Sequence, residues 1–180
     1  TKRGRKTEIV AGFPWFGRKG RDTFISLPGL TLSLEDVKTC KDVLDTISKE
    51  FRDGLFPHSG SATTISYSSA DTSLWFFWTL QMYAKHTGGN VEVWKSYGKK
   101  LVTILNAYRN GTLPLDIRMH ENGLIWTGNK GTALSWMDAI VNNLPVTPRN
   151  GYQVEVNALW YNAVMFAIEL AKENKDNKFV

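Results

Sequence analysis

The sequence "ALSWMDAI", residues 133–140, contains one acidic residue, Asp138, directly after Trp136 and Met137. A carboxylate in an apolar run needs a partner, because an unpaired buried charge is costly. Asp138 is therefore a helix-cap acid, a member of a buried hydrogen-bonded pair, or a catalytic group held against an aromatic wall. Desolvation favours the protonated form of a carboxyl group, as a general acid requires near neutral pH. Asp138 is therefore a catalytic candidate, and this segment alone leaves all three roles open.

A second polar pair occurs in "FPWFGRKGRDTF", residues 13–24, where Arg21 precedes Asp22. A guanidinium offers two parallel donors, and the neighbouring carboxylate accepts. Such a pair can hold two adjacent hydroxyl groups of a sugar ring. In the alternative interpretation, Asp22 caps a helix and Arg21 is its surface partner.

Four more residues are candidates for ligand binding. Asp71 precedes a long apolar run, so it either caps a helix or binds a ligand. Trp126 in "LIWTGNKG" is either a flat platform for a ligand or a hairpin aromatic that covers the core. Arg149 and Glu155 lie near the start of another apolar run. Glu155 is inside that run, so it needs a partner or a ligand.

Other chemistries fit the sequence poorly. His58, His86 and His120 are far apart and lack metal-ligand spacing, so we expect ordinary loop or surface histidines and no metal site. The sequence contains no nucleophile elbow, phosphate-binding loop or dinucleotide fingerprint, and we expect no cofactor. The remaining carboxylates, arginines and seven tryptophans suit glycoside hydrolysis, which uses two carboxyl groups.

The charge distribution argues against a nucleic-acid partner. The net charge is +5, but residues 1–21 hold seven basic residues and one acidic residue, which gives +6 in this segment alone. We expect residues 1–10 to form a flexible basic tail of a single domain. The one cysteine, Cys40, is expected to be a small buried hydrophobe in a reducing compartment, which suggests a cytoplasmic protein. No apolar run reaches the roughly 18 residues that span a membrane, so we expect no membrane partner.

The hydrophobic pattern predicts an all-α fold. The apolar spacing and the cap residues indicate long helices, and Asn122-Gly123 between short apolar runs indicates a small β-hairpin. Long loops separate the helices, so we expect helical hairpins packed side by side with functional loops at one end. The predicted helices are residues 20–30, 33–51 with Ser33 as N-cap, 72–87 after Asp71, 90–110, 133–143 and 153–174, and the long loops are 56–70, 112–131 and 144–152.

Four segments in order resemble the glycogen debranching enzyme family, and more narrowly its amylo-α-1,6-glucosidase catalytic domain. These segments are "GRDTFISLPGL", "YSSADTSLWFF", "LSWMDA" and "VTPRNGYQVEVNALWYNA". The similarity runs from about residue 11 to residue 170. It implies a six-hairpin α/α barrel, a toroid of two concentric helix rings. It also implies inverting hydrolysis of the α-1,6-linked glucose stub of a trimmed glycogen branch.

The resemblance assigns roles to individual residues. It implies that Asp138 is the general acid and that Arg21 and Asp22 line the pocket for the terminal glucose. Trp136, Arg149 and Glu155 match family positions that line the same pocket, and Asp71 and Trp126 complete our expected substrate-binding set. The expected partner is an α-glucan such as glycogen or limit dextrin.

About six predicted helices make up half of such a barrel, so we interpret residues 1–180 as the N-terminal half of the glucosidase domain. In this family the general base follows later in the chain, and we expect the 180 residues alone to be inactive. Half a toroid would leave Trp75-Phe76-Phe77-Trp78 partly uncovered, which predicts a homo-dimer through exposed barrel faces. The alternatives are a non-catalytic α-glucan-binding helical module and another α/α-barrel glucosidase of the trehalase type.

Overall fold

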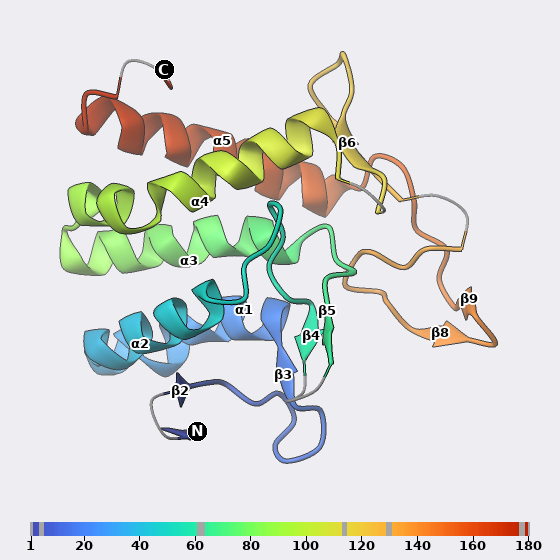
Figure 1. Cartoon of the computed structure of the whole chain (residues 1–180), viewed down its shortest axis with the longest axis horizontal. Helices are drawn as coiled ribbons and strands as arrows, with labels where there is room; N and C mark the ends of the chain where they lie inside the picture. The colour runs from blue at the N-terminus through green and yellow to red at the C-terminus, as the bar shows by residue number, and fades with distance from the viewer. Residues whose placement is uncertain are drawn as a thin grey trace.

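The computed structural model describes residues 2–3, 6–60, 64–112, 115–128, 131–176 and 179 and shows a helical body with small sheets at one end (Figure 1). Across this described part, about half of the residues lie in five α-helices, and no closed barrel is formed. The helices are α1 (Gly20–Leu30), α2 (Val37–Ser48), α3 (Thr72–Thr87), α4 (Asn90–Asn110) and α5 (Val154–Glu173).

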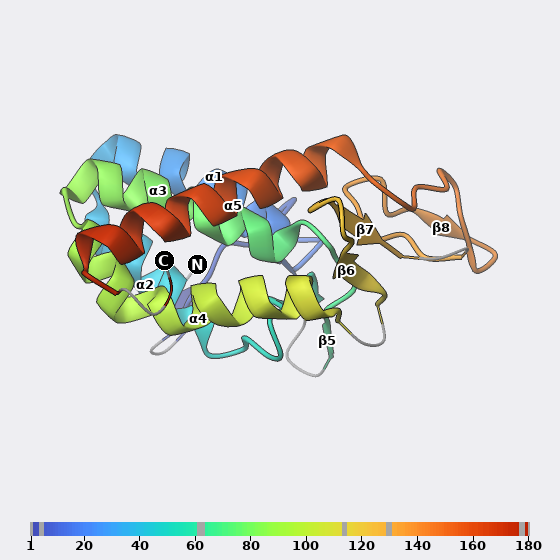
Figure 2. The ribbon, with the colours of Figure 1, turned by 90° about the horizontal axis from the view of Figure 1, so that it is seen from above.

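The helices form two layers. Helix α3 packs against both α1 and α5, while α4 packs against α3 and α5. Helix α2 contacts α1 and α3. Figure 2 shows α1, α3 and α5 on one side of the molecule and α2 and α4 on the other. Successive helices therefore alternate between the layers, as the predicted packing of helical hairpins requires. None of the described helices has the length and apolar character that crossing a lipid bilayer demands.

Glycine ends two of the predicted helices where the sequence indicated. Gly88 adopts a left-handed conformation (φ 65°) and caps the C-terminus of α3, and Gly111 (φ 99°) follows α4. A residue without a side chain adopts these positive φ values without strain, so each helix stops at its glycine. The predicted helix starting at residue 20 is also confirmed.

The predicted N-cap at Ser33 is wrong. Leu32–Leu34 form a single 3-10 turn, η1, and Glu35 is left-handed (φ 58°), which separates this turn from α2. Asp36 is the actual cap, since its carboxylate accepts a 2.9 Å hydrogen bond from the Thr39 backbone N–H. Both Ser33 and Asp36 are good cap residues, and the reversal at Glu35 decides between them.

The predicted helix over 133–143 is also wrong. The segment is irregular, with a bend at Ser135 and Trp136, and ends in a hairpin of β8 (Ile140–Val141) and β9 (Leu144–Pro145). Asn142 and Asn143 form its two-residue turn, with φ values of 51° and 60°. Asparagine tolerates left-handed backbone better than most residues, and hairpin turns of this length need it at both positions. The Asn-Asn pair between apolar residues was the signal for a hairpin.

The other strands are short and lie at the same end as this hairpin or near the N-terminus. The hairpin predicted around Asn122-Gly123 is confirmed as β6 paired with β7. The all-α expectation is therefore incomplete, while the flexibility of residues 1–10 stays a prediction. The remaining strands are β1 (Lys2–Arg3), β2 (Lys6–Thr7), β3 (Arg18–Lys19), β4 (Ser59–Gly60) and β5 (Ile65–Ser66), with β6 at Ile117–Met119 and β7 at Ile125–Thr127.

Aromatic rings fill the core between the layers. Phe24 packs edge-on against Phe56, with ring centroids 5.1 Å apart, and Phe56 lies 4.5 Å from Phe76. Phe76 and its neighbour Phe77 are fully buried. The expectation that this aromatic run is partly uncovered is therefore wrong for both phenylalanines, whereas Trp75 and Trp78 are partly exposed. Each buried ring contributes roughly 1.5–3 kcal/mol of hydrophobic stabilisation, so the run is a core element. Cys40 is buried, as predicted.

One helix face remains uncovered. Val154, Tyr161 and Met165 of α5 are exposed, and they follow one another at helical spacing on a single side of the helix. Such a spacing places them in one apolar stripe that no described element covers.

Candidate active site

A buried ion pair joins the start of α1 to the start of α3. The Arg21 guanidinium donates from Nε to Asp71 Oδ2 at 2.7 Å and from Nη2 to Asp71 Oδ1 at 2.9 Å. Asp71 is only 2% exposed, and Ser69 Oγ donates a further 2.6 Å hydrogen bond to Oδ1. This two-point geometry is the strong form of an arginine–carboxylate pair. It fixes the guanidinium plane and leaves the Nη1 side of Arg21 for another partner.

Asp71 occupies the N-cap position of α3 without capping it. Its carboxylate makes no cap hydrogen bond. Ser69 Oγ accepts instead from the Thr72 backbone N–H at 3.2 Å. The capping alternative for Asp71 is therefore wrong, because Ser69 satisfies a free amide of the helix and Asp71 is left to bind Arg21.

Asp138 is the second carboxylate on Arg21. Its Oδ2 lies 3.3 Å from Arg21 Nη1 and 3.1 Å from His58 Nε2. The side chain is 34% exposed, so solvent or a ligand reaches it. No helix surrounds Asp138, which excludes the cap role considered above. Its described neighbours are a guanidinium and an imidazole, so the paired interpretation holds. The groups that contact Asp138 Oδ2 are those of Arg21 and His58, and the expected aromatic wall of Trp136 is not among them.

Asp138 is carried by an irregular segment that is anchored on both sides. Ala70 directly precedes Asp71 in the chain, and its backbone N–H donates to Leu134 O at 2.8 Å. Ala133 forms a parallel bridge with Arg149. These contacts bring residues 133–138 against the loop that precedes α3, which is how two carboxylates far apart in sequence reach one guanidinium.

His58 is a site residue that the sequence interpretation missed. It was expected to be an ordinary loop or surface histidine, yet it is 8% exposed and contacts Asp138. Burial lowers the pKa of His58, and the nearby Arg21 charge lowers it further. No local pattern marks His58, because its partner lies far along the chain and only the fold brings the two together.

Gly20 allows this arrangement through close backbone packing. Its N–H donates to His58 O at 2.9 Å, and a Cβ at this position would collide with Pro57 O. Only glycine fits, so the backbone that carries His58 lies directly against the first residue of α1. Arg21 and His58 are thus positioned by one shared backbone contact.

Arg149 and Glu155 form a second ion pair near Asp138. Arg149 Nη2 lies 2.6 Å from Glu155 Oε1 and 2.8 Å from Oε2. Both side chains are partly buried. Arg149 Nη1 also lies 3.8 Å from the sulfur of Met137, the residue before Asp138. The predicted partner of Glu155 is therefore Arg149, and the pair lies beside the segment that carries the candidate acid.

The structure does not bring every predicted residue into contact with Asp138. Asp22 is exposed in the first turn of α1, and Trp136 is 54% exposed. Trp126 stacks on His120, with centroids 5.6 Å apart, and packs edge-on against Tyr152. This packing matches the hairpin-aromatic alternative for Trp126.

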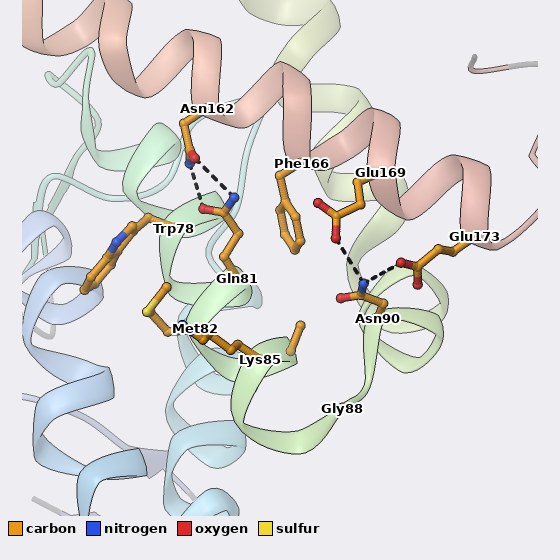
Figure 3. Close-up of a pocket in the computed structure, with 11 residues that line it drawn as sticks. Trp78, Gln81, Met82, Lys85, Gly88, Asn90, Asn162, Phe166, Glu169 and Glu173 are labelled. Atoms are coloured by element: carbon orange, nitrogen blue, oxygen red, sulfur yellow. Dashed lines mark hydrogen bonds between the residues drawn. The ribbon is translucent and has the colours of Figure 1, made fainter.

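A groove of about 690 Å³ lies between α3 and α5, and none of the predicted site residues lines it (Figure 3). Five of its polar lining residues are paired with one another: Gln81 and Asn162 exchange two hydrogen bonds, of 3.1 and 2.8 Å, and Asn90 donates to Glu169 and Glu173. The candidate site is therefore the loop-end cluster of Arg21, Asp71, Asp138 and His58.

Replacing Asp71 by alanine should reduce the free energy of unfolding by about 3–5 kcal/mol, because it leaves the buried Arg21 charge without its main partner. Urea denaturation of the purified variant measures this loss. Asp22→Ala is the matched control, with an expected loss below about 1 kcal/mol for an exposed first-turn acid. A small loss in Asp71→Ala would mean that the carboxylate is not needed to hold Arg21.

Folding should weaken as the pH falls below about 6.5, the ordinary pKa of an unfolded histidine. Because the pKa of His58 is lowered in the fold, the unfolded chain binds a proton that the native chain excludes. Its contribution is fully present above pH 6.5 and is lost as the pH falls from this value through the lower pKa of the folded state. Urea unfolding at several pH values should show a shallower dependence in His58→Gln than in the original chain. The control His86→Gln changes an exposed histidine, and equal slopes in all three proteins would contradict the assignment.

A comparison with protein families gives this cluster its context. The family model described as amylo-alpha-1,6-glucosidase matches residues 1–179, which include every residue of the cluster. The match agrees with the resemblance carried by the four sequence segments. The chain therefore belongs to the amylo-alpha-1,6-glucosidase family.

Proposed function

We propose that Asp138 is the general acid of an inverting site that removes α-1,6-linked glucose stubs from glycogen and limit dextrin. The observation that carries this proposal is the position of Asp138, a partly exposed carboxylate held by Arg21 and His58. A general acid must be reachable by substrate and fixed in orientation, and this carboxylate meets both conditions. The family match supports the reaction class.

The surrounding residues suit recognition of a sugar. Arg21 is fixed by the buried Asp71, and we propose that Asp71 acts on substrate through Arg21. Asp22 is exposed beside Arg21 and can accept hydroxyl donors, while the exposed ring of Trp136 offers a flat apolar face two residues from Asp138.

The peripheral residues are proposed to frame the pocket. The Arg149–Glu155 pair would form a rim beside Met137. Trp126, held by His120 and Tyr152, would be a more distant platform. A bound sugar would also displace water from the exposed part of the Asp138 side chain.

Inversion needs a second carboxyl group about 6.5–9.5 Å from the acid, with room for the attacking water. Asp71 is the other carboxylate on Arg21, but it is buried and engaged by Arg21 and Ser69, so it is unsuited to activate water. We therefore propose that the base is not part of this cluster and that residues 1–180 alone release glucose poorly.

The helix arrangement supports our proposal that the chain forms one part of an α/α barrel. Helices α1, α3 and α5 lie in one layer, and α2 and α4 in the other, as alternating inner and outer helices would. The apolar stripe on α5 would then contact a further helix or a second copy of the chain.

Asp138→Asn in the full-length protein should reduce glucose release from an α-limit dextrin by about 10²–10⁴-fold, the usual contribution of a general acid. Glucan binding should be largely retained, because asparagine keeps the shape of the side chain. Glucose release and binding to immobilised glycogen measure the two properties. Glu121→Gln is the control, since Glu121 is exposed on the β6–β7 hairpin. Glucan binding without any glucose release by the original protein would favour the non-catalytic binding module.

The apolar stripe on α5 should mediate a homo-dimer of the 180-residue chain. Replacing Tyr161 and Met165 together by glutamate places charge in this stripe and should give a monomer by light scattering at high protein concentration. Val91→Glu changes an exposed apolar residue of α4 and should leave the dimer intact. A monomeric original chain under the same conditions would disprove this interface.

A further inference from the structure

His58 is a buried histidine whose ring lies beside one described carboxylate, that of Asp138. Its Nε2 lies 3.1 Å from Asp138 Oδ2, and its Nδ1 is buried with no hydrogen-bond partner among the described residues. Buried polar nitrogens are usually paired on both sides of the ring. In His58 only Nε2 lies near a described polar side chain, that of Asp138, while Nδ1 has no described hydrogen-bond partner.

The backbone of His58 is fixed by two hydrogen bonds. Its N–H donates to Ser66 O at 2.7 Å, and its carbonyl accepts from Gly20 N–H at 2.9 Å. Ser66 belongs to β5, which pairs with β4 directly after His58. The residue is held between a small sheet and the start of α1, so the distance from its ring to Asp138 is set by backbone structure.

Four charged groups surround the ring. Arg21 and Lys19 disfavour a positive charge on His58, while Asp138 and Asp71 favour one. Burial is the largest influence and also disfavours the charge, so the pKa of His58 is lowered. The imidazole is accordingly neutral at pH 7 and carries one N–H.

The geometry selects the nitrogen that carries this hydrogen. A hydrogen on Nδ1 would bury an unpaired donor and direct the Nε2 lone pair at a carboxylate oxygen. A hydrogen on Nε2 places a donor 3.1 Å from the Asp138 carboxylate oxygen and leaves only an acceptor unpaired on Nδ1. Orphaned N–H donors are the rarer and costlier case. The Nε2–H tautomer is therefore favoured.

We propose that His58 is a positioning residue that binds Asp138 at Oδ2 through Nε2–H and thereby leaves Oδ1 to carry the transferable proton. Oδ2 accepts a 3.3 Å hydrogen bond from Arg21 Nη1–H and lies 3.1 Å from His58 Nε2, so both N–H groups face that oxygen and disfavour a proton on it. This inference rests on the proposed role of Asp138 as general acid. In the reaction, the Oδ1–H bond breaks as the glycosidic oxygen takes the proton. The electron pair of the C1–O bond passes to that oxygen while water attacks C1 and gives a proton to the general base, which we place outside the loop-end cluster.

Nitrogen NMR of the ¹⁵N-histidine-labelled chain tests the tautomer directly, with His58 assigned by its loss in His58→Gln. We expect a neutral ring at pH 7 with hydrogen on Nε2. In Asp138→Asn the tautomer should be retained and the pKa of His58 should fall further, because the Asp138 charge raises it. Asp22→Asn is the control and should not move this pKa. An Nδ1–H tautomer, an imidazolium at pH 7, or a His58 pKa that ignores Asp138→Asn would overturn the proposal.

A kinetic comparison in the full-length protein adds a readout that a purely structural histidine would not move. Glutamine can place an amide N–H near the position of Nε2, whereas alanine cannot. We expect His58→Gln to retain more of kcat than His58→Ala, and the pH profile of kcat to change in His58→Ala, with His86→Gln unchanged. Equal kcat and equal pH profiles for His58→Ala and the original protein would disprove positioning. If the original protein releases no glucose, the proposed function fails while the NMR result still decides the tautomer and the contact.

Discussion

The arrangement of the loop end depends on one guanidinium that serves two carboxylates. Arg21 lies in the first turn of α1. Its side chain contacts Asp71 at the start of α3 and Asp138 in an irregular segment far along the sequence. The buried Arg21 guanidinium needs a charged partner, because burying an unpaired charge costs several kcal/mol. Asp71 is this partner and is itself buried, so Asp138 can stay partly open to solvent. The division gives one acid a holding role and leaves the other available for chemistry.

Small backbone elements set the positions of these side chains. The three-stranded sheet of β3, β4 and β5 leads into Gly20 and carries His58 on the neighbouring connection. Residues 133–138 are tied to the loop before α3 and to Arg149. The helices provide the rigid body, while the loops at one end carry the polar groups, a distribution common to many binding and catalytic sites. This separation explains why the core contains aromatic rings and the cluster contains almost none.

The sequence was most informative where the determinants are local. Helical spacing and terminal glycines predicted α1, α3, α4 and α5, and Asn122-Gly123 predicted the β6–β7 hairpin. Most residues of the cluster were identified because they lie in segments that resemble the family. Such a resemblance points to site residues without showing which of them are in contact. His58 could not be found in this way, because its importance arises from a contact with Asp138. The role of Asp71 was ambiguous for a related reason, since Ser69 performs the capping that Asp71 was expected to supply.

Gly20 has a consequence for how this site tolerates genetic change. The residue has no side-chain atom and takes no part in chemistry, yet the close approach of Pro57 requires its missing Cβ. Any missense substitution there would push the backbone of His58 away from the first turn of α1 and displace Arg21 as well. The contact also borders the aromatic core, because Phe24 of α1 packs against Phe56, the residue before Pro57. Variation at this position would therefore disturb the site and the adjacent core packing together, although glycine contributes no side chain to either.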